Sequence, residues 1–140
     1  LRRQRQMCIR DRMLVNGGPH PFDPHLWLCA WLVSDSGCPV DVFDTVLSPR
    51  DLALGVERLN ASAVLISVST ALETDRLQRS LGPLSVPKLL FGVAVTLHRH
   101  ALAADPDCHL LDSPLAAYRC LQDLKPRARQ NTVSGNDPCN

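Results

Sequence analysis

Ala63-Val64-Leu65-Ile66 is the stretch that decides the fold of this 140-residue chain. Its residues are apolar without alternation, which is typical of a central parallel strand that is covered on both faces. Ser69 and Thr70 follow it, and the pattern then predicts a helix over residues 72–81, ended by Gly82-Pro83. A strand that leads directly into a helix is the repeating unit of a parallel α/β sheet.

The same alternation extends in both directions from this stretch. Ser48-Pro49-Arg50-Asp51 predicts a helix start, because Ser48 can cap the helix and proline is favoured at the first helical position. Gly37 stands where a C-terminal glycine would end an earlier helix. The chain is therefore predicted to be a flavodoxin-like (Rossmann-like) α/β domain, with a five-stranded parallel sheet and helices on both faces. The expected strands are 13–16, 39–43, 63–66, 88–91 and 108–111, and the expected helices are 24–36, one from 49, 72–81, 97–104 and 114–124.

Composition excludes several classes of protein. The formal net charge is +1, so there is no overall electrostatic footprint for nucleic acid. No apolar run reaches the roughly 18 residues that a membrane span needs, and no secretory signal is legible. The six cysteines include no C-x-x-C pair, so free thiols in a cytoplasmic protein are expected.

Both ends of the chain are expected to lie outside the domain. Residues 6–12 resemble the conceptual translation of a transposon-end sequencing adapter, so residues 1–12 are interpreted as an artefact that carries no fold information. The alternative is an ordinary basic N-terminal arm. The domain is expected to span residues 13–124, followed by a disordered tail over 125–140. On this interpretation the chain is a fragment whose natural protein continues upstream.

Asp23 and His25 follow the first predicted strand, and Ser69 and Thr70 follow the third. Ligands of open α/β sheets bind at the carboxyl ends of the strands, where a histidine can ligate a metal and a nearby acid can orient its ring. The alternative interpretation is structural. Asp23 before Pro24 is also a natural helix cap, and His25 would then be merely exposed.

Three short motifs resemble the cobalamin-binding domain family. They are Asp23-x-His25-x-x-Leu28, Thr70-x-Leu72 and Phe91-Gly92, where the family carries Asp-x-His-x-x-Gly, Ser-x-Leu and Gly-Gly. The 41 residues between Leu28 and Thr70 match the family spacing. The resemblance covers residues 13–124 and is nearest to the sensory domain of MerR-type transcriptional regulators.

The resemblance implies roles for individual residues. His25 matches the lower axial ligand of cobalt, which makes it the metal ligand, and Asp23 matches its partner in the motif. Thr70 and Leu72 match residues that line the pocket for the nucleotide tail of the cofactor, with Ser69 beside them. Gly92 matches the second glycine of the Gly-Gly pair. The implied cofactor is cobalamin.

Two departures from the family pattern affect this inference. Leu28 and Phe91 stand at glycine positions, and glycine is used where backbone and ligand come close. The tail channel is therefore expected to be filled by side chains. Three outcomes remain open: cobalamin bound with an altered tail position, a ligand-free interaction domain, or haem bound through His25.

The implied context is a bacterial regulator. The chain is expected to be its ligand-sensing domain and to have no catalytic residues. It is expected to work with upstream DNA-binding and helical-bundle domains of the same protein, and a homo-oligomer is one option for its assembly. It is expected to contact neither membrane nor nucleic acid directly. The rival is the cobalamin-carrying module of a methyltransferase or mutase, which needs a buried tail. His98 is a lesser candidate for contacting a ligand, and exposure is expected for it.

Overall fold

A computed structural model describes residues 11–19, 23–71, 73–102 and 105–124 of the chain. Five strands form one sheet in the order β2-β1-β3-β4-β5, and every neighbouring pair is parallel. The flavodoxin-like α/β prediction is therefore confirmed. The strands are β1 (Arg12–Asn16), β2 (Val40–Phe43), β3 (Ala63–Ser67), β4 (Lys88–Phe91) and β5 (Cys108–Leu111).

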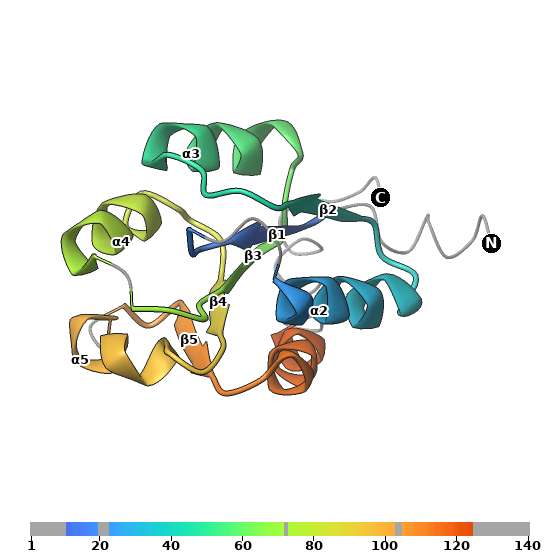
Figure 1. The fold of residues 1–140 in the computed structure, drawn as a ribbon. Coiled ribbons are helices and arrows are strands. Elements are labelled where there is room, and N and C mark those ends of the chain that lie inside the picture. Colours follow the sequence, from blue (N-terminus) through green and yellow to red (C-terminus); the bar gives the residue numbers. More distant parts are fainter. Residues whose placement is uncertain (1–10, 20–22, 72, 103–104, 125–140) are drawn as a thin grey trace.

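Helices cover both faces of this sheet (Figure 1). One face packs against α2 (Pro24–Asp35) and a helix over residues 114–124. The other face packs against α3 (Pro49–Arg58), α4 (Thr74–Leu81) and the short α5 (Arg99–Leu102), which the 3-10 turn η1 (Val95–His98) precedes.

The strand pleat divides the core into two apolar layers. Met13 and Val15 of β1 face α3 and α4, whereas Leu14 between them faces α2. Every residue of β3 is buried, as its unbroken apolar run predicts. The order of the strands reverses between β1 and β3, and the carboxyl edge at such a reversal is where ligands bind in this architecture.

Local capping signals explain where the helices begin and end. Ser48 caps α3 by accepting a hydrogen bond from the Asp51 amide at 3.1 Å, and Gly37 after α2 has φ of 93°, a backbone conformation that glycine favours. Helix α4 begins at Thr74, two residues later than expected, and its cap residue Glu73 makes no side-chain capping bond.

The N-terminal boundary also differs slightly from the prediction. β1 begins at Arg12, one residue earlier than expected. Arg12 is buried, and its Nη1 donates a hydrogen bond to Ser62 Oγ at 2.6 Å. Residues 1–10 and 125–140 lie outside the described residues, so the artefactual N-terminus and the disordered tail stay predictions.

The cysteines follow the expectation in part. Cys29, Cys108 and Cys120 have free thiols. Cys38 is disulfide-bonded, so the expectation of free thiols throughout is wrong for this residue. In the described part of the chain, no helix combines the length and apolar character that a membrane crossing requires.

Candidate functional site at the carboxyl edge of β1 and β3

Asp23 is the centre of the candidate site. It is 4% exposed and caps α2, with Oδ1 accepting a hydrogen bond from the His25 amide at 3.0 Å. Its other oxygen accepts hydrogen bonds from the hydroxyl of Ser67 and, at 3.4 Å, from that of Ser69. Both oxygens of the buried carboxylate are thus used, and they join the start of α2 to the end of β3.

Ser67 is a site residue that the sequence reasoning missed. It is the last residue of β3 and is fully buried. The signal was a polar residue that ends an otherwise apolar strand, although Ser69 and Thr70 were singled out instead. Ser67 lies 44 residues from Asp23 in the sequence, so only the sheet brings the two side chains together.

His25 projects from the first turn of α2. Its side chain is 48% exposed, and Nδ1 lies 3.7 Å from Asp23 Oδ1. That distance is longer than a hydrogen bond, so the contact is electrostatic. A carboxylate beside Nδ1 orients the ring and leaves Nε2 available to an outside ligand. The structural and functional interpretations of Asp23 are therefore compatible, because the carboxylate that caps α2 also lies beside the His25 imidazole.

Thr70 lies across the edge from the loop that follows β1. A Cβ atom built on Gly18 would be 3.4 Å from Thr70 Oγ1, an ordinary contact distance. Among the described residues, this buried hydroxyl has no hydrogen-bond partner. Such an unsatisfied group at a strand edge calls for an explanation, and a bound ligand is one. Leu72, the other residue of this motif, lies outside the described residues.

Leu28 and Phe91, the two side chains expected to fill the tail channel, lie in different places. Phe91 is fully buried and packs in the core beneath α2, beside Ser67, its register partner in β3. Leu28 is 46% exposed and lies on the outer surface of α2. Phe91 therefore fills the interior near the candidate site. Leu28 does not enter that interior, because its side chain lies on the outer surface of α2.

Gly92 has a structural reason for its identity. Its φ is 136°, and an added Cβ would lie 2.2 Å from the backbone oxygen of Val68. The turns after β3 and β4 approach each other closely there, since the Val68 amide donates to Phe91 O at 2.8 Å and the Ala94 amide to Val68 O at 3.2 Å. Gly92 thus holds neighbouring loops of the edge together.

The remaining histidine and metal candidates add little to this edge. His98 in η1 is 3% exposed, so the expectation that it is exposed is wrong. Because η1 continues into α5 on the face of α3 and α4, this turn packs against the core. In the described ranges, no group of three or more His, Cys, Asp or Glu side chains is placed to hold a metal ion by itself.

Comparisons with known proteins identify the fold. No family model matches the chain, and no curated protein matches it significantly in sequence. Among solved structures, it is similar to a cobalamin-binding protein from Desulfitobacterium hafniense DCB-2, with a TM-score of 0.65 and 15% sequence identity. The match covers 81% of this chain and 58% of that chain, so this chain spans less than two thirds of its structural neighbour. The chain therefore shares the α/β fold of that protein.

Proposed function

We propose that this chain is a ligand-sensing regulatory domain of the cobalamin-binding type, from a cytoplasmic bacterial transcriptional regulator whose DNA-binding part lies elsewhere in the protein. One observation carries the proposal. A half-exposed imidazole, His25, stands at the reversal point of the sheet beside a buried carboxylate, Asp23, that two other hydrogen bonds hold in place. The fold shared with a cobalamin-binding protein supports it.

The residues fit a metal that brings most of its own ligands. His25 offers one nitrogen at the edge, and among the described residues it belongs to no group of three or more metal-ligating side chains. A metal in a macrocycle would meet this condition, because the macrocycle would supply most of the ligands and His25 would supply one more. Cobalamin is the proposed cofactor, and haem is the alternative with the same requirement.

The interior beneath α2 does not fit a deeply buried nucleotide tail. Phe91 occupies the core there with no exposed surface. Cobalamin would therefore be held by His25 with its tail at the open edge, near the unpartnered hydroxyl of Thr70. A cofactor-carrying enzyme module needs the buried tail, so the sensory role is favoured over a methyltransferase or mutase module.

Sensing would act through Asp23. Ligation at His25 changes the charge and position of the ring beside the Asp23 carboxylate, whose other oxygen is bonded to the end of β3. The edge loops and the start of α2 would then differ between the two states. A ligand shifts such an equilibrium only through its different affinities for those states.

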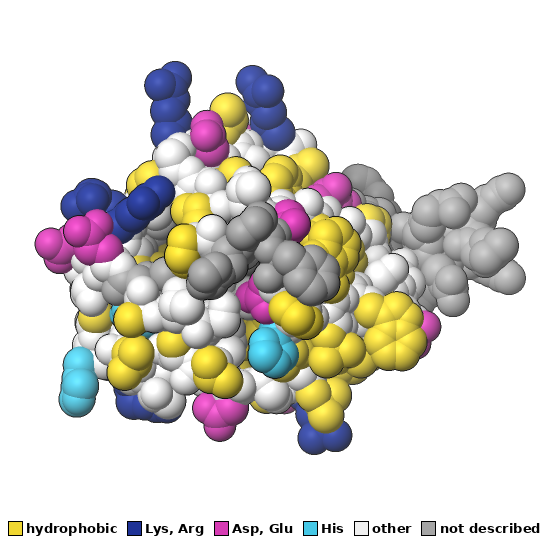
Figure 2. Space-filling view, viewed as in Figure 1, with side chains coloured by type: hydrophobic (Ala, Val, Ile, Leu, Met, Phe, Trp, Pro, Cys, Tyr) yellow, Lys and Arg dark blue, Asp and Glu magenta, His cyan; other side chains and the backbone are white. Residues whose placement is uncertain are grey.

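A second candidate function is a ligand-free interaction domain, which the outer face of α2 favours. Trp27, Leu28 and Trp31 are 44%, 46% and 66% exposed on this helix, and hydrophobic side chains gather over it in Figure 2. A helix that is apolar on all sides is usually covered. The proposed partner is the helical bundle upstream in the same protein.

Visible spectroscopy separates the two candidates. The whole chain is mixed with hydroxocobalamin or haemin and desalted, and the spectrum of the retained protein is recorded for the wild type, His25→Ala and His100→Ala. His100 is an exposed histidine outside the site, so it is the matched control. Colour that the wild type and His100→Ala retain and His25→Ala loses supports ligation. No retained colour with either cofactor would overturn the sensory proposal.

Tryptophan fluorescence tests the interaction candidate. Trp27 and Trp31 are the two tryptophans of the chain, so its emission reports on the outer face of α2. We expect emission typical of exposed indoles from this chain and a shift to shorter wavelength in the product of the complete gene. An unchanged emission maximum would contradict a covered α2.

A further inference from the structure

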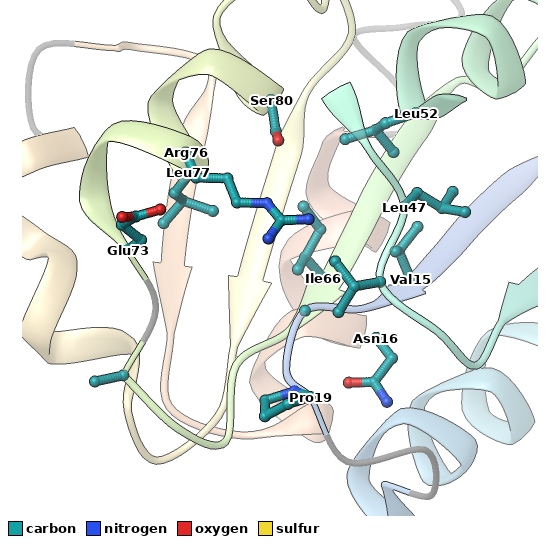
Figure 3. A pocket seen from close by; sticks show the side chains of 13 residues that line it. Val15, Asn16, Pro19, Leu47, Leu52, Ile66, Glu73, Arg76, Leu77 and Ser80 are labelled. Carbon is teal, nitrogen blue, oxygen red and sulfur yellow. The ribbon is translucent and has the colours of Figure 1, made fainter. Parts of the chain in front are cut away.

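A hollow lies on the opposite face of the sheet from α2. It is a cavity of about 260 Å³ between α3 and α4 (Figure 3). Val15 and Ile66 form its floor, and Leu52 and Leu77 form its walls, each of them at most 6% exposed. Buried side chains of four elements therefore form the base of the cavity, and exposed residues such as Val46, Ala71 and Arg76 complete its lining.

Two polar side chains of α4 enter this apolar space. The guanidinium of Arg76 extends over Val15 and Ile66, and the hydroxyl of the buried Ser80 points into the same space (Figure 3). Within the described ranges, Arg76 forms no ion pair with a carboxylate. A guanidinium over an apolar floor is an arrangement that favours an anion with an apolar body.

We propose that this cavity binds a small carboxylic acid, with its carboxylate on Arg76 and a branched or aromatic body against Val15, Ile66 and Leu52. The charge argues for a monoanion. Arg76 is the one cation of the lining, which also includes one carboxylate, that of Glu73. A phosphate dianion would lack a second positive partner.

The volume limits the size of the ligand. Pockets for drug-sized molecules usually measure roughly 300–1,000 Å³, and this cavity is slightly below that range. Its lining is mainly apolar, so an extended polar metabolite would leave its hydrogen-bonding groups unpaired. Short branched-chain and simple aromatic carboxylates match both the size and the polarity.

The lining of the cavity includes neither His25 nor Asp23. His25 is on α2 and Phe91 packs beneath that helix, whereas the cavity lies beneath α3 and α4. The two sites share the carboxyl edge of the sheet, because Asn16, Gly17, Pro19 and Ala71 also line the cavity. The proposal therefore goes beyond cofactor sensing and does not depend on it. His25→Ala is expected to keep the carboxylate affinity of the wild type, so failure of one proposal is distinguishable from failure of the other.

Titration with benzoate, followed by NMR of the whole chain, tests the proposal. We expect the signals of Val15 and Ile66 to shift, and benzamide, the neutral isostere, to bind about tenfold more weakly. Arg76→Gln is expected to lose a similar factor in benzoate affinity. Arg79→Gln is the matched control, because Arg79 is an exposed arginine of the same helix outside the lining.

Ser80→Leu provides an independent variant. The added side chain would occupy the cavity and should abolish benzoate binding, while circular dichroism and thermal unfolding report that the fold is kept. Shifts confined to surface residues, equal affinities for benzoate and benzamide, or equal losses in Arg76→Gln and Arg79→Gln would each overturn the proposal. Inorganic phosphate that binds as tightly as benzoate would contradict the preference for a carboxylate.

Discussion

The hydroxyl of Ser67 at the end of β3 donates a hydrogen bond to the buried carboxylate of Asp23 at the start of α2. This bond crosses between two strand–helix units and holds the edge on which His25 stands. Because the other Asp23 oxygen accepts from the His25 amide, the same carboxylate caps the helix, anchors it to the sheet and faces the imidazole. Structure and proposed ligation therefore depend on one side chain.

Asp23→Ala is expected to lower the free energy of unfolding by about 2–4 kcal/mol. Loss of a helix cap costs about 1 kcal/mol, and a buried hydroxyl left without its partner costs about 1–3 kcal/mol more. Urea denaturation at neutral pH measures the change. Ser48→Ala removes only the cap of α3 at an exposed position, so it should cost less. Equal costs for the two variants would contradict the anchoring role of Asp23.

Gly92→Ala is expected to destabilise the protein by at least ~2 kcal/mol. The backbone at φ of 136° is unfavourable for any residue with a Cβ, and that atom would overlap the Val68 carbonyl oxygen. Gly18→Ala is the matched control at the same edge. Its Cβ would meet Thr70 Oγ1 at 3.4 Å, so a change below ~1 kcal/mol is expected. Thermal unfolding of both variants decides whether Gly92 is a backbone requirement.

Local sequence patterns predicted most of the fold, because strands, helices and helix caps depend on residues that are near one another in the sequence. The buried run at Ala63–Ser67 and the caps at Ser48 and Gly37 each carry their own physical cause. The hydrogen bond between Ser67 and Asp23 could not be predicted from local patterns, because it depends on the order of the strands in the sheet. The burial of His98 likewise depends on how the turn after β4 packs.

The cavity beneath α3 and α4 illustrates the same limit. Arg76 and Ser80 are ordinary members of an amphipathic helix in the sequence, and nothing in the spacing distinguishes them from Arg79. They lie near Val15 and Ile66 because α4 packs against this face of the sheet. Sequence reasoning thus singled out the candidate edge, whose residues end strands, and missed the cavity, which arises from packing between elements.

Asp105→Asn is expected to destabilise the protein by ~1–3 kcal/mol at pH 7. Lys88 is 2% exposed, and its Nζ lies 2.8 Å from Asp105 Oδ2. The hydrogen bond from Lys88 lowers the pKa of Asp105, so its contribution is present above the unfolded pKa of about 4 and is lost as pH falls through the folded value. Urea denaturation should show a difference between wild type and variant that shrinks from pH 7 to pH 3.

Asp107→Asn is the control for this pair. Asp107 is exposed, and only its backbone amide contacts Asp105, at 2.9 Å. This variant should stay close to the wild type at both pH values. A pH-independent loss in Asp105→Asn would show that Lys88 and Asp105 do not stabilise the fold through their charges.

Asp41→Asn is expected to stabilise the protein at pH 7. A hydrogen bond with Asp11, burial and repulsion between the two carboxylates raise the pKa of Asp41 to about 6. Between about pH 4 and pH 6 the folded chain holds a proton that the unfolded chain releases, so stability falls as pH rises through this window. The variant lacks this loss and should gain about 1 kcal/mol at pH 7, after allowance for solvent screening. Thermal unfolding at pH 4 and pH 7 measures the effect, with Asp112→Asn as an exposed control. A gain that is equal at both pH values would contradict the carboxylate pair as its cause.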